Sequence, residues 1–162
     1  MKTAYLGLGS NLGDREANLR EAVQRLEAGD VRLTRRSSLY EAAPRDVLDQ
    51  PAFLNAVIEI ETELFPMQLL ARAQTVERDM GRQRVTPKGP RNIDVDILFY
   101  GRVVIATPEL EVPHPRIAER RFVLEPLAEI APELRHPVTG KTAREMLATI
   151  EPQGVRRLDV SL

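Results

Sequence analysis

The stretch FLNAVIEIETELFPMQLLARAQTVERDMG, residues 53–81, holds a strand pattern followed at once by a helix pattern. Its first part has an apolar residue at every second position, namely Leu54, Ala56, Ile58 and Ile60. This alternation predicts a strand over residues 53–62 with one apolar face. Pro66 suits the first turn of the helix that follows, because the missing N–H costs little there. The apolar stripe of that helix consists of Leu69, Ala73, Val76 and Met80, and Gly81 is expected to end it.

Towards the N-terminus, strand and helix patterns occur in the same order. Residues 3–8 are a short apolar run that ends in glycines, which predicts a buried strand. Asp14 can cap a helix after it, because its carboxylate can accept from a free N–H group of the first turn. The apolar stripe of that helix consists of Leu19, Ala22, Val23 and Leu26. Residues 31–40 mix Val, Leu and Thr with arginines, as expected of a half-exposed strand.

Towards the C-terminus, a further strand completes the pattern. Residues 41–52 and 81–92 are expected to be long loops, the second of them basic and rich in Gly and Pro. Residues 93–100 then predict a strand, and residues 102–105 are expected to return from it as a hairpin. The order βαββαβ is typical of an α+β, ferredoxin-like fold, a mainly antiparallel sheet with helices on one face.

The last third of the chain is expected to add short elements to this core. Residues 122–130 and 142–150 predict short helices, and residues 155–160 predict a final strand. No repeat or linker divides the chain, so residues 1–162 are expected to form one domain.

Composition limits the classes of function. The 162 residues contain 23 Lys and Arg, 24 Asp and Glu and no Cys, and 43% of them are hydrophobic. A near-neutral chain lacks the basic excess of a non-specific nucleic-acid binder, so a polyanion site would have to be local. No apolar run approaches the roughly 20 residues that cross a bilayer. We therefore expect a soluble, cytoplasmic protein with neither nucleic acid nor a membrane as its partner. We also expect it to be a monomer.

Two carboxylates in the strand of residues 93–100 are the clearest chemical signal. Asp94 and Asp96 share one face of that strand, about 7 Å apart along the chain, and Ile93, Val95, Ile97 and Phe99 are expected on the other face. Such a pair also fits a strand whose polar face simply meets water. Asp is a poor strand former, however, and the pair directly follows a loop that carries Arg82, Arg84, Lys88 and Arg91. Hard oxygen ligands beside arginines indicate Mg²⁺ and phosphate chemistry.

Two glycine motifs of nucleotide-binding proteins are incomplete. Residues 140–142 spell the end of a P-loop, but Arg135 stands where its first glycine belongs. Gly7, Gly9 and Gly13 miss the dinucleotide-binding spacing, because Leu12 occupies the place of the third glycine. We interpret the glycines near the N-terminus as serving a turn and close packing.

Four segments together carry a resemblance to a known family. They are YLGLGSNLG at residues 5–13, QPAFLNA at 50–56, GPRNIDVDI at 89–97, and VPHP at 112–115 with Arg120 and Phe122 behind it. Taken in this order, they resemble the 6-hydroxymethyl-7,8-dihydropterin pyrophosphokinases of the folate pathway. The resemblance covers nearly the whole chain, and the Gly-Pro-Arg-x-x-Asp-x-Asp block is its most specific part.

The resemblance implies transfer of the β,γ-diphosphate of ATP, the co-substrate, to the hydroxymethyl group of a reduced pterin, with release of AMP. It implies that Asp94 and Asp96 bind two Mg²⁺ ions and that Arg82 and Arg91 are catalytic. The pterin site that it implies consists of Pro44, Phe53, Asn55, Asp94 and Phe122. The nucleotide site that it implies consists of Gln74, Glu77, Arg82, Arg84, Arg91, Ile97, His114 and Arg120.

The chain departs from some family members in its basic loop, where it has Lys88 and no Trp. The alternatives are a non-catalytic ferredoxin-like module that binds a ligand or RNA, and a two-metal phosphohydrolase. An RNA-binding sheet would show several exposed aromatic residues within a basic strand motif, which none of the expected strands has. A ligand-binding module would not need paired carboxylates beside arginines, and a phosphohydrolase would usually supply more metal ligands.

Overall fold

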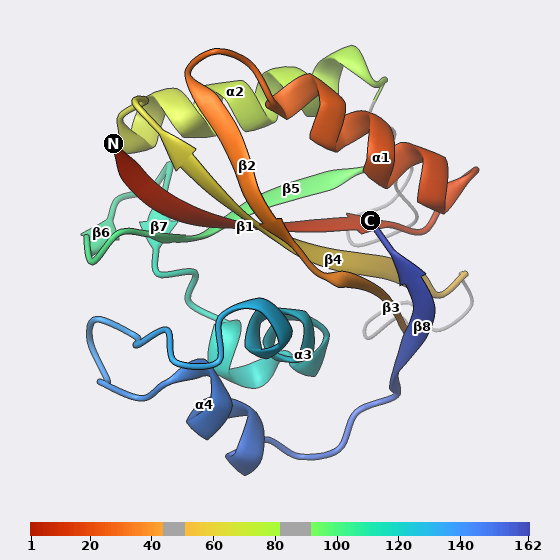
Figure 1. Cartoon of the computed structure of the whole chain (residues 1–162), viewed down its shortest axis with the longest axis vertical. Coiled ribbons are helices and arrows are strands. Elements are labelled where there is room, and N and C mark those ends of the chain that lie inside the picture. Colours follow the sequence, from red (N-terminus) through yellow and green to blue (C-terminus); the bar gives the residue numbers. More distant parts are fainter. Residues whose placement is uncertain (44–50, 82–91) are drawn as a thin grey trace.

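The structure, a computed structural model, describes residues 1–43, 51–81 and 92–162. The core elements are β1 (Lys2–Ser10), α1 (Arg15–Leu26), β2 (Val31–Arg36), β3 (Ser38–Ala42), β4 (Phe53–Thr62), α2 (Pro66–Asp79) and β5 (Asp94–Tyr100). After them come β6 (Ile105–Ala106), β7 (Glu111–Val112), a 3-10 turn (Ile117–Glu119), α3 (Arg121–Ile130), α4 (Ala143–Thr149) and β8 (Val155–Ser161). The predicted α+β class and the order of the core elements are confirmed (Figure 1).

The main sheet has the strand order β5-β1-β4-β3-β8, and β2 also pairs with β4. Its pairings are all antiparallel. The single strand predicted over residues 31–40 is two strands, because the ladder along β4 is interrupted at Ser37. The Ser37 N–H donates to Val57 O at 3.0 Å, and the Val57 N–H donates to Ser37 Oγ at 2.9 Å. The hydroxyl thus takes the place of a backbone acceptor at the break.

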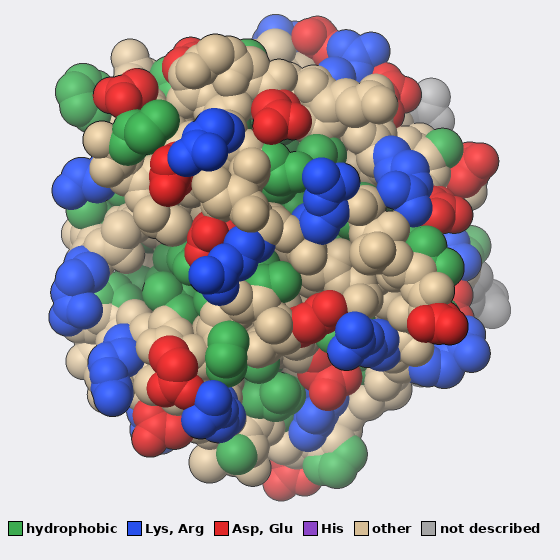
Figure 2. Space-filling view, viewed as in Figure 1, with side chains coloured by type: hydrophobic (Ala, Val, Ile, Leu, Met, Phe, Trp, Pro, Cys, Tyr) green, Lys and Arg blue, Asp and Glu red, His purple; other side chains and the backbone are tan. Residues whose placement is uncertain are grey.

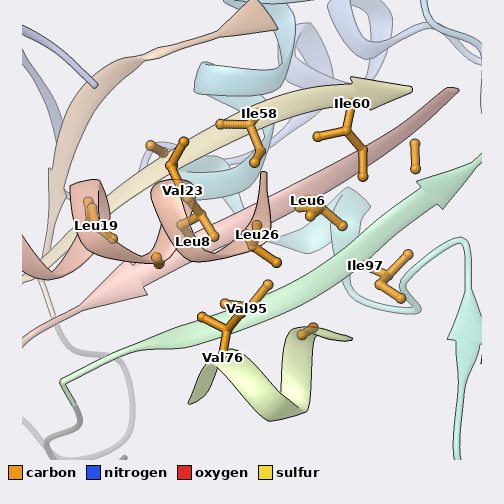
Figure 3. Close-up of a cluster of buried hydrophobic side chains, with 14 of the residues drawn as sticks. Leu6, Leu8, Leu19, Val23, Leu26, Ile58, Ile60, Val76, Val95 and Ile97 are labelled. Carbon is orange, nitrogen blue, oxygen red and sulfur yellow. The ribbon is translucent and has the colours of Figure 1, made fainter. Parts of the chain in front are cut away.

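Helices cover both faces of the sheet (Figure 1). On one face, α1 and α2 pack their apolar stripes onto β1, β4 and β5, as Leu26, Leu6 and Ile58 illustrate in Figure 3. This face is the one expected for a ferredoxin-like core. On the other face, α3 and α4 pack onto Tyr5 and Val57 in a second apolar cluster. The C-terminal helices therefore complete the fold by burying the face that the βαββαβ core leaves open.

The ends of the two core helices follow the expected chemistry. The Asp14 side chain caps α1 by accepting from Ala17 N at 3.2 Å. After α2, Gly81 has a φ of +69°, in the left-handed region that a glycine adopts without steric cost. The Asp14 cap thus marks where the chain enters α1 after β1, and Gly81 marks where it leaves α2.

Two predictions around β5 are wrong. Residues 102–105 do not return along β5 as a hairpin, because Gly101 turns the chain away and Ile105–Ala106 pairs with β7 in a separate small sheet. Phe99 does not share the face of Val95 and Ile97. The β1–β5 register shifts at this point, a bulge that rotates the strand and places Phe99 in the second apolar cluster.

Charge is finely mixed over the molecular surface in the view of Figure 2, where basic and acidic side chains alternate without a continuous area of one sign. This agrees with the formal net charge of -1. Among the helices of residues 1–43, 51–81 and 92–162, none has both the length and the apolar character needed to span a membrane.

Candidate active site

A cleft of about 220 Å³ opens on the face of the sheet that carries α3, beyond the end of the second apolar cluster. Strands β1, β3, β4 and β5 supply its sheet side, and the segment from His114 to Val123 supplies the opposite wall. Of the residues predicted for the site, the cleft is lined by Phe53, Asn55, Asp94, Asp96, His114, Arg120 and Phe122. These residues span 70 positions of sequence, and the antiparallel register brings them together.

Two glycines on β1 form the floor of the cleft. Gly9 pairs with Asn55 of β4 on one side and with Asp94 of β5 on the other, while Gly7 pairs with Asp96. A Cβ atom at Gly9 would lie 3.0 Å from Asn55 Oδ1, closer than ordinary van der Waals contact. The missing side chains therefore leave the space into which the neighbouring strands present a carboxylate and an amide.

Asp94 and Asp96 both line the cleft, as their shared strand face predicts. Asp94 is half-buried and Asp96 is exposed. Within the described ranges no group of three or more acidic, His or Cys side chains could hold a metal ion. A pair of carboxylates suits Mg²⁺, which commonly takes one or two carboxylates and completes its shell with water and substrate phosphates. The donor set therefore fits a magnesium–nucleotide site.

Next to the carboxylates, the cleft offers an aromatic and amide surface. Phe53 and Phe122 line it from β4 and α3, and the Arg120 guanidinium lies 5.5 Å from the centroid of the Phe122 ring. Asn55 is only 6% exposed, and its Nδ2 atom has no hydrogen-bond partner among the described residues. A buried amide nitrogen without an acceptor is costly, which indicates that a ligand supplies the acceptor. A flat heterocycle with a polar edge suits this arrangement.

His114 faces the same cleft in its neutral form. Burial, together with the nearby Arg120 and Arg116 guanidinium groups, lowers the pKa of His114 from 6.5 to about 4. Its Nδ1 atom accepts from Arg116 N at 3.2 Å, so the proton of the neutral ring is on Nε2. At neutral pH the imidazole is therefore an uncharged hydrogen-bond donor.

The remaining predicted residues lie elsewhere. Gln74 is exposed on α2, whereas Glu77 is half-buried and its Oε2 atom accepts from Val95 N at 2.8 Å, directly beside the carboxylate pair. Ile97 packs in the first apolar cluster, so its side chain faces away from the cleft. Four predicted residues, Pro44, Arg82, Arg84 and Arg91, lie outside the described residues.

The structure also adds cleft residues that the sequence reasoning did not assign. Gly7 and Gly9, Ala42 and Ala43 of the β3 end, Arg116 and Glu119 all line it. A sequence signal for the two glycines was present, because Gly7 and Gly9 are two positions apart and therefore lie on the same face of a strand. No comparable signal marks Arg116 or Glu119, because their position depends on how the segment after His114 folds over the sheet.

Comparison with known proteins identifies one family over most of the chain. A family model described as 7,8-dihydro-6-hydroxymethylpterin-pyrophosphokinase (HPPK) matches residues 5–132. The 2-amino-4-hydroxy-6-hydroxymethyldihydropteridine pyrophosphokinase of Methylorubrum extorquens is 45% identical over 160 residues, covering 98% of this chain and 100% of that protein. The protein of the same name from Bacillus subtilis is 46% identical, covering 94% of this chain and 88% of that protein.

Other similar proteins are much longer. The folic acid synthesis protein fol1 of Pneumocystis carinii is 47% identical over 86% of this chain, but the chain spans only 19% of its length. Among solved structures, Plasmodium falciparum HPPK-DHPS wild type with pteroate has a TM-score of 0.73 at 17% identity. The match covers 91% of this chain and 42% of that one. At this identity the likeness concerns the fold alone.

Proposed function

The chain belongs to the 7,8-dihydro-6-hydroxymethylpterin-pyrophosphokinase family, and from this premise we propose that it diphosphorylates 6-hydroxymethyl-7,8-dihydropterin in folate biosynthesis. ATP is the co-substrate, its β,γ-diphosphate is transferred to the hydroxymethyl group, and AMP is released. One observation carries the proposal. One cleft holds a carboxylate pair suited to Mg²⁺ beside two phenylalanines and the buried Asn55 amide, whose nitrogen has no hydrogen-bond partner in the described part of the chain.

In the proposed reaction, the hydroxymethyl oxygen of the pterin attacks the β-phosphorus of ATP. The bond between that phosphorus and the oxygen bridging to the α-phosphate breaks, AMP leaves with that oxygen, and the hydroxyl proton is released. Such transfers depend mainly on in-line positioning and on stabilisation of the charge on the phosphoryl oxygens. Asp94 and Asp96 would hold Mg²⁺, two ions in our proposal, which supplies Lewis-acid polarisation of the phosphates.

The pterin end of the cleft is assigned to Phe53, Asn55 and Phe122. The two rings would stack on the faces of the heterocycle, and the Asn55 amide would bond to its polar edge. Asn55 Nδ2 then gains the acceptor that it lacks among the described residues. Pro44, which lies outside the described residues, and Asp94 are assigned to the same site.

The nucleotide end is assigned to the cationic and polar side of the cleft. His114 would donate from Nε2 as a neutral group, and Arg120 would contribute positive charge. Glu77 contributes to this end by holding the backbone of β5 at Val95, between the two carboxylates. Gln74 and the backbone of Ile97 would complete the nucleotide contacts. Arg82, Arg84 and Arg91, which lie outside the described residues, are assigned to the phosphates, with Arg82 and Arg91 in the catalytic role.

The chain is further proposed to act as one domain and as a monomer, with small molecules as its partners. The compact sheet with helices on both faces supports a single catalytic unit. Sedimentation equilibrium at micromolar concentration measures the association state, and a dimer mass would contradict this part of the proposal.

The deciding experiment measures AMP formation from ATP and Mg²⁺, with and without 6-hydroxymethyl-7,8-dihydropterin. We expect AMP and the pterin diphosphate in equal amounts, and no AMP when the pterin or Mg²⁺ is left out. AMP release that is independent of the pterin, or ADP as the nucleotide product, would overturn the proposal. A non-catalytic module would bind the pterin but release no AMP.

A further inference from the structure

The C-terminal strap, residues 150–156, lies beyond residue 132, where the match to the family model ends. It nevertheless reaches both walls of the cleft. On the β3 wall, Gly154 O accepts from Ala43 N at 3.2 Å, and Val155 pairs with Ala42. On the α3 wall, the strap contacts the segment that carries Arg120 and Phe122 through Gln153.

Gln153 holds the backbone on both sides of Arg120. Its Nε2 atom donates to Glu119 O at 2.9 Å, and its Oε1 atom accepts from Arg121 N at 3.1 Å. One side-chain amide thus joins the end of the 3-10 turn to the start of α3, and Arg120 is the residue between the two bonds. A side-chain amide carries both the donor and the acceptor that these two backbone groups require, on two atoms of one planar group.

A physical reason for this contact lies at the start of α3. The first N–H groups of a helix have no partner within the helix and are usually satisfied by a capping side chain. Arg120 occupies the cap position of α3 but makes no side-chain capping bond. Gln153 therefore supplies from 32 residues away the acceptor that the local sequence lacks, which leaves the Arg120 side chain directed at the Phe122 ring.

The strap is itself anchored at its other end, so that Gln153 is held in place. The Arg156 guanidinium lies 3.0 Å from Glu41 Oε1, and the Arg15 guanidinium lies 3.0 Å from Glu41 Oε2. Arg15 also donates to Ala52 O at 2.9 Å, next to Phe53. Both phenylalanine walls are thus connected through the strap and its anchor.

We propose that Gln153 is a positioning residue for the pterin site, which it serves by holding the backbone around Arg120 so that Phe122 faces the ring of the substrate. The inference rests on the proposed function, because it assigns Phe122 to pterin binding. Gln153 contacts no substrate and takes no part in the chemistry. Its removal should therefore weaken pterin binding while the rate of the bound complex is largely retained.

The test compares Gln153→Met with Gln153→Glu. Met keeps the length of the side chain and removes both hydrogen bonds, whereas Glu keeps the acceptor for Arg121 N and loses the donor to Glu119 O. For Gln153→Met we expect the Kd and KM for the pterin to rise about three- to tenfold, as loss of one or two hydrogen bonds implies. Gln153→Glu should lie between that variant and the wild type. The matched control is Glu151→Gln, an exposed position in the same strap, which should leave both constants unchanged.

Direct pterin binding in the absence of ATP, the KM for the pterin, kcat and the thermal unfolding midpoint are measured for each variant. A raised Kd with kcat within about twofold of the wild type supports the positioning role. An unchanged pterin Kd in Gln153→Met overturns the positioning role. A lowered kcat with Kd and KM unchanged also overturns it, because that result is expected if the two hydrogen bonds only keep more molecules folded. A wild-type protein that neither binds nor converts the pterin would instead refute the proposed function. The measurement on the wild type alone therefore distinguishes failure of the proposed function from failure of the Gln153 proposal.

Discussion

Replacing Gly9 by Ala tests the geometry of the cleft floor more directly than removing any side chain. The added Cβ would lie 3.0 Å from Asn55 Oδ1 and 3.7 Å from Phe53 Cδ1. The first distance is shorter than a relaxed contact by a few tenths of an ångström, so Asn55 has to move. Asn55 is 94% buried, which leaves it little room to do so without changing the direction of its amide.

The expected magnitude follows from the bonds that the amide would make. Misplacing one or two hydrogen bonds to the pterin edge costs about 1–2 kcal/mol, or a roughly 5- to 30-fold rise in the Kd for the pterin. The free energy of unfolding should change by less than about 1 kcal/mol, because the alanine methyl restricts the unfolded chain and partly offsets the strain.

Gly7→Ala is the matched control, on the same strand and the same face. The atoms nearest to a Cβ there belong to the Leu98 side chain, with Cδ2 at 3.4 Å, which is close to ordinary contact. We expect less than about a twofold change in the pterin Kd for this variant, since a contact at this distance needs little adjustment. Fluorescence titration with the pterin in the absence of ATP measures the pterin Kd of the two variants. An unchanged Kd in Gly9→Ala, or an equal loss in Gly7→Ala, would refute the reasoning.

Three further predictions concern other parts of the cleft. Asp96→Asn should lower kcat by at least about a hundredfold through loss of transition-state charge stabilisation, with the unfolding midpoint retained; near-normal turnover would remove Asp96 from the metal site. Phe122→Ala should raise the pterin Kd about tenfold through loss of ring contact, with a smaller change in ATP binding, and an equal change in both would contradict the assignment of Phe122. Because the pKa of His114 falls from 6.5 to about 4 on folding, the unfolded chain binds a proton in this window that the folded chain does not. The free energy of unfolding should therefore decrease as pH falls from 6.5 to 4, by on the order of 1–2 kcal/mol after solvent screening, and His114→Gln should flatten this part of the curve; an NMR titration of His114 near pH 6.5 would disprove the argument.

Much of the fold could be predicted because its signals are local. The alternation in residues 53–62 and the stripe from Leu69 to Val76 follow from the repeat of a strand and of a helix. Phe99 could not be placed in the same way, because its face depends on a bulge in the pairing of β5 with β1. The hairpin predicted for residues 102–105 was wrong for a related reason. The partner of β6 is β7, and the choice of a strand's partner depends on long-range contacts.

The residues of the candidate site also differ in whether a local sequence signal marks them. Asp94 and Asp96 were recognisable from their spacing on one strand face, and the family resemblance pointed to Phe53, Asn55, His114, Arg120 and Phe122. Arg116 and Glu119 carry no signal of their own and join the cleft only because the chain after His114 folds back over the sheet. Gly9 likewise can be recognised as part of the cleft floor only when its neighbours in the sheet are known.

By itself, therefore, the amino-acid sequence determined the type and order of the elements, the shared face of the two carboxylates and the family. Only the tertiary structure decided that Gly9 lies between Asn55 and Asp94, that α3 and α4 close the second face, and that Gln153 holds the segment around Arg120. The physical reason is the range of the interactions. Periodicity and capping act over a few residues, whereas strand order, the burial of the Asn55 amide and a cap supplied from 32 residues away exist only after the chain has folded.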